Sequence, residues 1–163
     1  MNSTRLNTLS RMAAVIGEQQ CAYWKFFSPF ADRLERELGE YLGDPSAVAL
    51  SSATSEFSFC SGSYHHQGLG FEDGKFRIPL MFRIKHLRDE GDDQVRIRLY
   101  FVMEADRITA EVAGEPTITV NKDDLTSLLE YVYQHLCTLF SDPYWFAKYH
   151  TDYQGTKIGF PPL

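Results

Sequence analysis

The sequence predicts an α+β fold: a two-layer domain with N-terminal helices, an antiparallel meander of about five or six strands, and a long C-terminal helix packed on one sheet face. Three observations predict it. Apolar residues recur every three or four positions near both ends of the chain, they alternate with polar residues between residues 46 and 120, and turn-forming segments separate the alternating runs. Strands that are apolar on one face need a cover, and amphipathic helices supply it.

Two helices are expected before residue 43. The first has an apolar stripe at three- and four-residue spacing, formed by Leu6, Leu9, Met12, Ala13 and Ile16. An aromatic run follows at residues 23–27. Ser28 can cap a second helix, Pro29 suits its first position, and Gly43-Asp44-Pro45 is typical of a helix end. A second helix is therefore expected to start at residues 28–29.

The central part of the chain alternates with the period of two that half-buried strands show. The expected strands span residues 46–50, 54–60, 75–86, 94–104, 107–113 and 116–120. Asp73-Gly74 is a strong hairpin signal, and it would fold residues 64–72 back onto the strand 75–86 with Phe71 opposite Phe76. A continued ladder would place His65 opposite Phe82 and His66 opposite Met81, with His66 and Tyr64 on the polar face.

Two further turns set the registers of the long strands. A two-residue turn at Glu90-Gly91 would pair Ile84 with Ile97, Lys85 with Arg96 and Arg83 with Arg98. A turn at Ala105-Asp106 would pair Phe101 with Ala110 and Tyr100 with Glu111. After the sheet, Asn121 is expected to cap a helix over residues 122–140.

Length and charge narrow the class of protein. A chain of 163 residues favours one domain, expected over residues 1–155 with a tail at 156–163. The net charge of −6 disfavours broad binding to nucleic acid or to an anionic membrane. No apolar run approaches the roughly 20 residues of a membrane span, and the N-terminus lacks a signal-peptide core. A soluble, cytoplasmic protein is expected.

The cysteines Cys21, Cys60 and Cys137 are odd in number and widely spaced. This pattern favours reduced thiols over a disulfide framework.

Residue parity gathers six of the sixteen Lys and Arg on one face of the predicted sheet, namely Lys75, Arg77, Arg83, Lys85, Arg96 and Arg98. Like charges directly opposite one another are unfavourable by about 0.2–1 kcal/mol per pair, and an anionic partner would relieve them. The expected binding residues are Tyr64, His66, Arg77, Arg83, Lys85, Arg96, Arg98 and Tyr100. The alternative is a solvated face whose charge is balanced by neighbouring acids such as Glu104 and Glu111.

The run at residues 58–71 contains Cys60, His65 and His66, but it does not predict catalysis or metal binding. Adjacent histidines in a strand point to opposite faces, and a zinc site needs about four converging ligands. Cys60 has no base at strand spacing that would activate its thiol. No catalytic residue, metal ion or cofactor is expected. A ligand cavity between the sheet and the last helix near His65 is left open.

These observations predict a non-enzymatic binding or adaptor protein that contacts an acidic protein segment, or another anionic partner, through the cationic sheet face. The charge elsewhere disfavours nucleic acid as the partner, and no membrane contact is expected. The alternative is a small-ligand-binding cavity protein, enzymatic or not, with its pocket near His65. The aromatic segments at residues 23–27 and 144–153 could pack on each other or join two copies in a homodimer.

Overall fold

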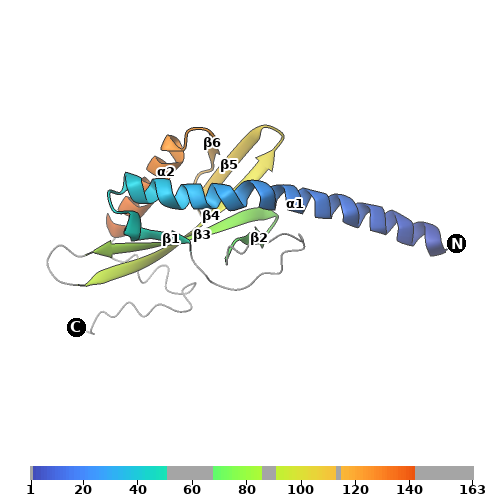
Figure 1. Cartoon of the computed structure of the whole chain (residues 1–163), viewed down its shortest axis with the longest axis horizontal. Coiled ribbons are helices and arrows are strands. Elements are labelled where there is room, and N and C mark those ends of the chain that lie inside the picture. Colours follow the sequence, from blue (N-terminus) through green and yellow to red (C-terminus); the bar gives the residue numbers. More distant parts are fainter. Residues whose placement is uncertain (1, 51–67, 86–90, 113–114, 142–163) are drawn as a thin grey trace.

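The computed structural model describes residues 2–50, 68–85, 91–112 and 115–141, which form an α+β fold (Figure 1). A long helix, α1 (Asn2–Tyr41), precedes an antiparallel sheet, and a second helix, α2 (Thr126–Ser141), follows it. A 3₁₀ turn, η1 (Pro45–Ala47), leads into the first strand. The strands are β1 (Val48–Leu50), β2 (Gly70–Glu72), β3 (Lys75–Lys85), β4 (Asp92–Glu104), β5 (Arg107–Val112) and β6 (Ile118–Val120). The predicted fold class is confirmed. The strand predicted at 54–60 and the C-terminal tail lie outside the described residues.

The helix α1 is continuous where two helices were predicted. Pro29 lies inside it, and Ser28 is buried within it instead of capping a new helix. An internal proline costs about 3 kcal/mol, because it lacks an N–H and its ring crowds the preceding turn. Packing offsets this cost, since Phe27 before the proline and Phe30 and Leu34 after it are all buried in one core. The shared apolar face therefore decides the continuity of the helix.

The strand order in the sheet is β1-β3-β4-β5-β6, and β2 also pairs with β3. β1 and β2 share one edge of β3, with β2 pairing to residues 75–77 and β1 to residues 80–82. The hairpin predicted at Asp73-Gly74 is confirmed, because both residues have positive φ (51° and 76°) and Phe71 lies opposite Phe76.

The hairpin of β4 and β5 also has its predicted register. Phe101 lies opposite Ala110 and Tyr100 lies opposite Glu111. Its tight turn contains Ala105 with φ of 49°, at the position that the sequence predicted.

The predicted register between β3 and β4 is wrong by four residues. The opposed pairs are Ile84 with Asp93, Lys85 with Asp92, and Arg83 with Gln94. The observed register is not centred on the predicted turn at Glu90-Gly91, and residues 86–90 lie outside the described residues. A shift by an even number leaves every side chain on its predicted face, so the apolar pattern could not distinguish the two registers. The new register removes the predicted opposition of Arg83 to Arg98 and of Lys85 to Arg96.

Both helices contribute to one hydrophobic core on the apolar face of the sheet. Phe27 of α1 stacks on Phe76 of β3 with ring centroids 4.9 Å apart, and its ring lies 5.2 Å from that of Phe101 of β4. Leu128 and Val132 of α2 are buried in the same core. The opposite face of the long strands therefore carries their polar side chains.

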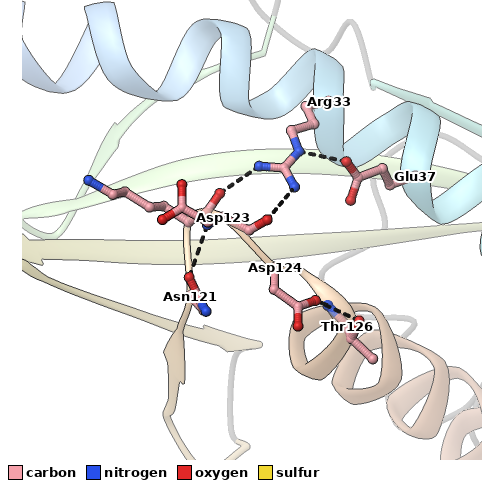
Figure 2. Close-up of polar contacts among 7 residues, drawn as sticks. Arg33, Glu37, Asn121, Asp123, Asp124 and Thr126 are labelled. Atoms are coloured by element: carbon pink, nitrogen blue, oxygen red, sulfur yellow. Dashed lines mark hydrogen bonds and ion pairs between the residues drawn. The ribbon is translucent and has the colours of Figure 1, made fainter.

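Arg33 joins α1 to the segment that precedes α2, as Figure 2 shows. Its guanidinium donates to the backbone carbonyl oxygens of Lys122 (2.5 Å) and Asp123 (3.2 Å), and its Nε donates to Glu37 Oε1 (2.6 Å). One side chain thus connects elements about ninety positions apart in the sequence.

The helix α2 begins at Thr126, four residues later than predicted. Two side-chain-stabilised turns occupy the preceding segment. Asn121 Oδ1 accepts a hydrogen bond from the Asp123 N–H, and Asp124 Oδ1 accepts one from the Thr126 N–H, each at 3.0 Å (Figure 2). Asn and Asp favour such local bonds over the first turn of a helix, which explains the later start.

Replacement of Leu34 by Ala will destabilise the fold by about 2–5 kcal/mol, because it removes a fully buried side chain from the core. The matched control is Val15→Ala in the same helix, where the side chain is 54% exposed and the expected change is within about 0.5 kcal/mol. Urea unfolding followed by circular dichroism measures both. Equal losses in the two variants would contradict the assigned core.

Candidate binding surface

The face of the sheet opposite the core contains the described residues of the predicted binding surface. The sequence predicted correctly which residues of β3 and β4 point to the core, and the basic residues alternate with those core residues along the strands. The basic residues from β3 are Lys75, Arg77, Arg83 and Lys85, and those from β4 are Arg96 and Arg98, with Tyr100 beside them. The structure therefore brings the six residues together, but in a different register and with different neighbours.

One end of this face is an ion-pair network. Arg77 Nη1 lies 2.9 Å from Glu72 Oε2, and the Arg77 side chain is only 13% exposed. The hydroxyl of Tyr100 donates to the same Glu72 oxygen at 3.2 Å. Burial raises the pKa of the Tyr100 hydroxyl, and the Glu72 carboxylate raises it further, so this tyrosine is neutral at physiological pH.

Lys75 belongs to the same end of the face. Its ammonium forms an ion pair with Glu111, and that hydrogen bond lowers the pKa of the Glu111 carboxyl group. Glu111 lies on β5, in the register that the sequence predicted. The expectation that neighbouring acids would balance part of the cationic face is met here.

Lys85 is paired at the other end of β3. Its Nζ lies 3.2 Å from Asp44 Oδ2, in the segment that follows α1. Asp44 Oδ1 also accepts hydrogen bonds from the N–H of Ser46 at 2.9 Å and from its hydroxyl at 2.6 Å. The Ser46 hydroxyl and then Lys85 hold the pKa of Asp44 at about 2. Lys85 therefore links β3 to the segment after α1, in addition to being an exposed cation.

Three arginines of the cationic face, Arg83, Arg96 and Arg98, are exposed, as Lys85 is, and we call these three the arginine cluster. Arg96 and Arg98 are two residues apart on one face of β4, about 7 Å along the strand. Arg83 lies opposite Gln94, so Arg96 is its diagonal neighbour across the ladder, about 7–8 Å away. Three guanidinium groups at this spacing can each bind a carboxylate through two parallel hydrogen bonds.

Two predicted binding residues, Tyr64 and His66, lie outside the described residues, as do Cys60 and His65. The residues of β3 that were predicted opposite the histidines, Phe82 and Met81, pair with Val48 and Ala49 of β1. Gly68, two residues before β2, has a φ of 93°, which favours glycine. Among the described residues, the ladder of β2 against β3 has three residue pairs.

The expectation of reduced thiols is wrong for Cys21, which is disulfide-bonded, whereas Cys137 is free. Cysteine count and spacing could not show this, because disulfide geometry depends on which segments the fold brings together. Within the described ranges, no group of three His, Cys, Asp or Glu residues is placed to hold a metal ion. No helix in that part of the chain is long and apolar enough to cross a membrane.

Sequence reasoning did not identify the pair formed by buried His135 and partly exposed Glu115. His135 Nδ1 lies 3.3 Å from Glu115 Oε1, close enough for an ion pair but without hydrogen-bond geometry. Burial lowers the pKa of His135, and the Glu115 carboxylate opposes that change. The position of His135 on the buried stripe of α2 was the only sequence signal for it, and it indicates packing.

A comparison of the chain with protein-family models, curated proteins and solved structures finds no match.

Replacement of Ser46 by Ala will raise the pKa of Asp44 from about 2 towards its ordinary value of 3.8. Lys85→Ala will raise it less, because the Ser46 hydroxyl is the larger cause. Since folding lowers this pKa, Asp44 stabilises the fold above about pH 4, and the stabilisation is lost as the pH falls towards 2. Carboxyl carbon NMR titration measures both values. A larger effect from Lys85→Ala than from Ser46→Ala would contradict the assignment.

The unfolding free energy will decrease as the pH falls below 6.5, because the unfolded chain protonates His135 more readily than the folded chain does. Glu115→Gln will lower the pKa of His135 further, because it removes the carboxylate that favours the charged ring. NMR titration of the imidazole, assigned with His135→Gln, gives the pKa directly. A value at or above 6.5 in the unsubstituted protein would contradict the effect of burial.

Proposed function

We propose that this protein is a non-enzymatic adaptor that binds an acidic protein segment through its cationic sheet face, with the arginine cluster as the main contact. The observation that supports it is the exposure of Arg83, Arg96 and Arg98 together on one face of a regular ladder. Lys75, Arg77 and Lys85 on the same face form ion pairs with Glu111, Glu72 and Asp44.

Charge distribution favours a protein partner. Outside the arginine cluster, thirteen Lys and Arg stand against twenty-two Asp and Glu. A long polyanion such as nucleic acid would be repelled beyond this small patch, whereas a short acidic segment could stay within it. A two-stranded ladder with Arg96 and Arg98 two residues apart on one face fits an extended peptide, whose own side chains alternate with the same period.

The expected interaction is weak and salt-dependent. Exposed ion pairs contribute about 0.2–1 kcal/mol each, although bidentate arginine–carboxylate pairs are among the stronger ones. Salt screens such charges over a Debye length of about 8 Å at physiological ionic strength. Electrostatic complementarity of this kind mainly raises the association rate and selects the partner.

Combined replacement of Arg83, Arg96 and Arg98 by Ala will weaken binding of a fluorescent ten-residue oligoglutamate peptide by about tenfold or more, because it removes the guanidinium groups that contact carboxylates. The matched control carries Arg11→Ala, Lys25→Ala and Arg36→Ala, which remove three exposed cations from α1. Fluorescence anisotropy at low salt measures both, and the control should change affinity less than about threefold.

The proposal is wrong if both triple variants lose affinity equally, since net charge alone would then explain binding. It is also wrong if a single-stranded DNA decamer binds more tightly than the peptide and depends on the same three arginines. Loss of peptide affinity between about 50 and 200 mM salt is required in every case.

A further inference from the structure

The N-terminal part of α1 exposes a row of large apolar side chains. Figure 1 shows α1 extending towards the N-terminus beyond the sheet. Every residue from Arg5 to Ile16 is exposed. The exposed fractions are 64% for Leu6, 62% for Leu9, 59% for Met12, 54% for Val15 and 54% for Ile16. Single exposed apolar residues are ordinary, but a contiguous row of them indicates an interaction surface.

This row is the same stripe that packs on the sheet further along the helix. At alternating three- and four-residue steps, Leu6, Leu9, Ala13 and Ile16 continue through position 20 into Tyr23, Phe27, Phe30 and Leu34. Such a heptad pattern keeps all these positions on one side of a helix. The sheet covers the stripe from Tyr23 onwards. Before Tyr23 the stripe is exposed, although it lies on the same side of α1 as the residues that pack on the sheet.

We propose that a second copy of this chain covers the exposed stripe, so that the N-terminal segments of two α1 helices pair antiparallel in a homodimer. The order of large and small side chains along the stripe suits packing against a second, antiparallel copy of the same stripe. In an antiparallel pair centred on position 11, Leu6 packs against Ile16 of the second copy, and Leu9 packs against Ala13 of the second copy. Each large side chain at the centre then meets a small one, as close helix packing requires. This surface is separate from the arginine cluster.

Length and charge favour the antiparallel orientation. Residues 2–20 form a helical segment of about 28 Å. In the antiparallel pair the second helix ends near position 20, where the sheet begins to cover the stripe. In a parallel pair it would continue into the space that the sheet occupies. Antiparallel pairing also brings Arg5 of each copy next to the level of Glu18 of the other, whereas parallel pairing would set Arg5 beside Arg5 and Glu18 beside Glu18. Arg11 lies level with Arg11 of the second copy, but on the side of the helix away from the stripe.

The surface area predicts a weak dimer. The side chains of Leu6, Leu9 and Ile16, with Met12 at the edge of the stripe, are about 60% exposed in each copy, and a pair would remove roughly 500 Å² of their apolar surface from water. This is below the about 1,200 Å² of stable interfaces and is typical of transient ones. We therefore expect a dissociation constant on the order of 10–100 μM. A flat bilayer fits less well, because the stripe faces the side on which the sheet lies.

Sedimentation equilibrium of the full chain from about 5 to 500 μM tests the dimer. Ile16→Gln will raise the dissociation constant at least about tenfold. Val15→Gln is the matched control, because Val15 is equally exposed but lies about 100° around the helix, off the stripe. Its effect should stay below about twofold. Glutamine is a better helix former than either residue, so unwinding cannot explain a difference.

Spin labels test the orientation in a Cys137→Ser background. Glu18→Cys and Arg11→Cys both place the label on the side away from the stripe. In the antiparallel pair, labels at position 11 lie at the same height, whereas labels at position 18 are offset by about 21 Å along the helix axis. Pulsed electron resonance should therefore give a clearly longer distance at position 18.

Three results would overturn the proposal. One is a monomer throughout the concentration range, and another is an equal effect of Ile16→Gln and Val15→Gln. The third is equal label distances at positions 11 and 18, which would indicate a parallel pair. If the protein stays monomeric but sediments with phosphatidylcholine vesicles in an Ile16-dependent manner, the stripe binds a membrane surface instead.

Discussion

The packing of one apolar stripe of α1 on the inner face of the sheet is the interaction on which the rest of the structure depends. Phe27 lies against both Phe76 and Phe101, and so joins the helix to the two longest strands. Tyr23 adds a polar anchor, because its hydroxyl donates to the Met103 carbonyl oxygen and accepts from the Met103 N–H. The burial of this stripe keeps α1 continuous through Pro29, and Arg33 on the same helix connects it to the start of α2.

The polar face of the sheet follows from that packing. Because the helices fill one side of β3 and β4, alternation leaves the basic side chains on the other. Acids from other elements pair with three of these cations: Glu111 of β5 with Lys75, Glu72 of β2 with Arg77, and Asp44, in the segment after α1, with Lys85. The result is a face that has ion pairs towards both ends of β3 and that also carries the exposed side chains of Arg83, Arg96 and Arg98.

The two proposed surfaces are compatible because they use different parts of the fold. The arginine cluster lies on β3 and β4, whereas the exposed stripe lies on the first four turns of α1. Two copies joined through α1 would carry two arginine clusters. A partner with two acidic segments could then bind both at once, with an avidity above that of either contact alone.

The sequence by itself determined the fold class, the faces of the strands and two of the three predicted hairpin registers, because these depend on neighbouring residues. A period of two decides which side chains share a face, and Asp73-Gly74 accepts the positive φ values of its turn. For the same reason, parity placed Arg77, Arg83, Lys85, Arg96, Arg98 and Tyr100 on one face correctly. Tertiary structure alone decided the register of β3 on β4, the continuity of α1, the disulfide at Cys21 and the acid that pairs with each cation. Each of these requires contacts between segments far apart in the chain, and alternation is unchanged when a strand slides by an even number of residues.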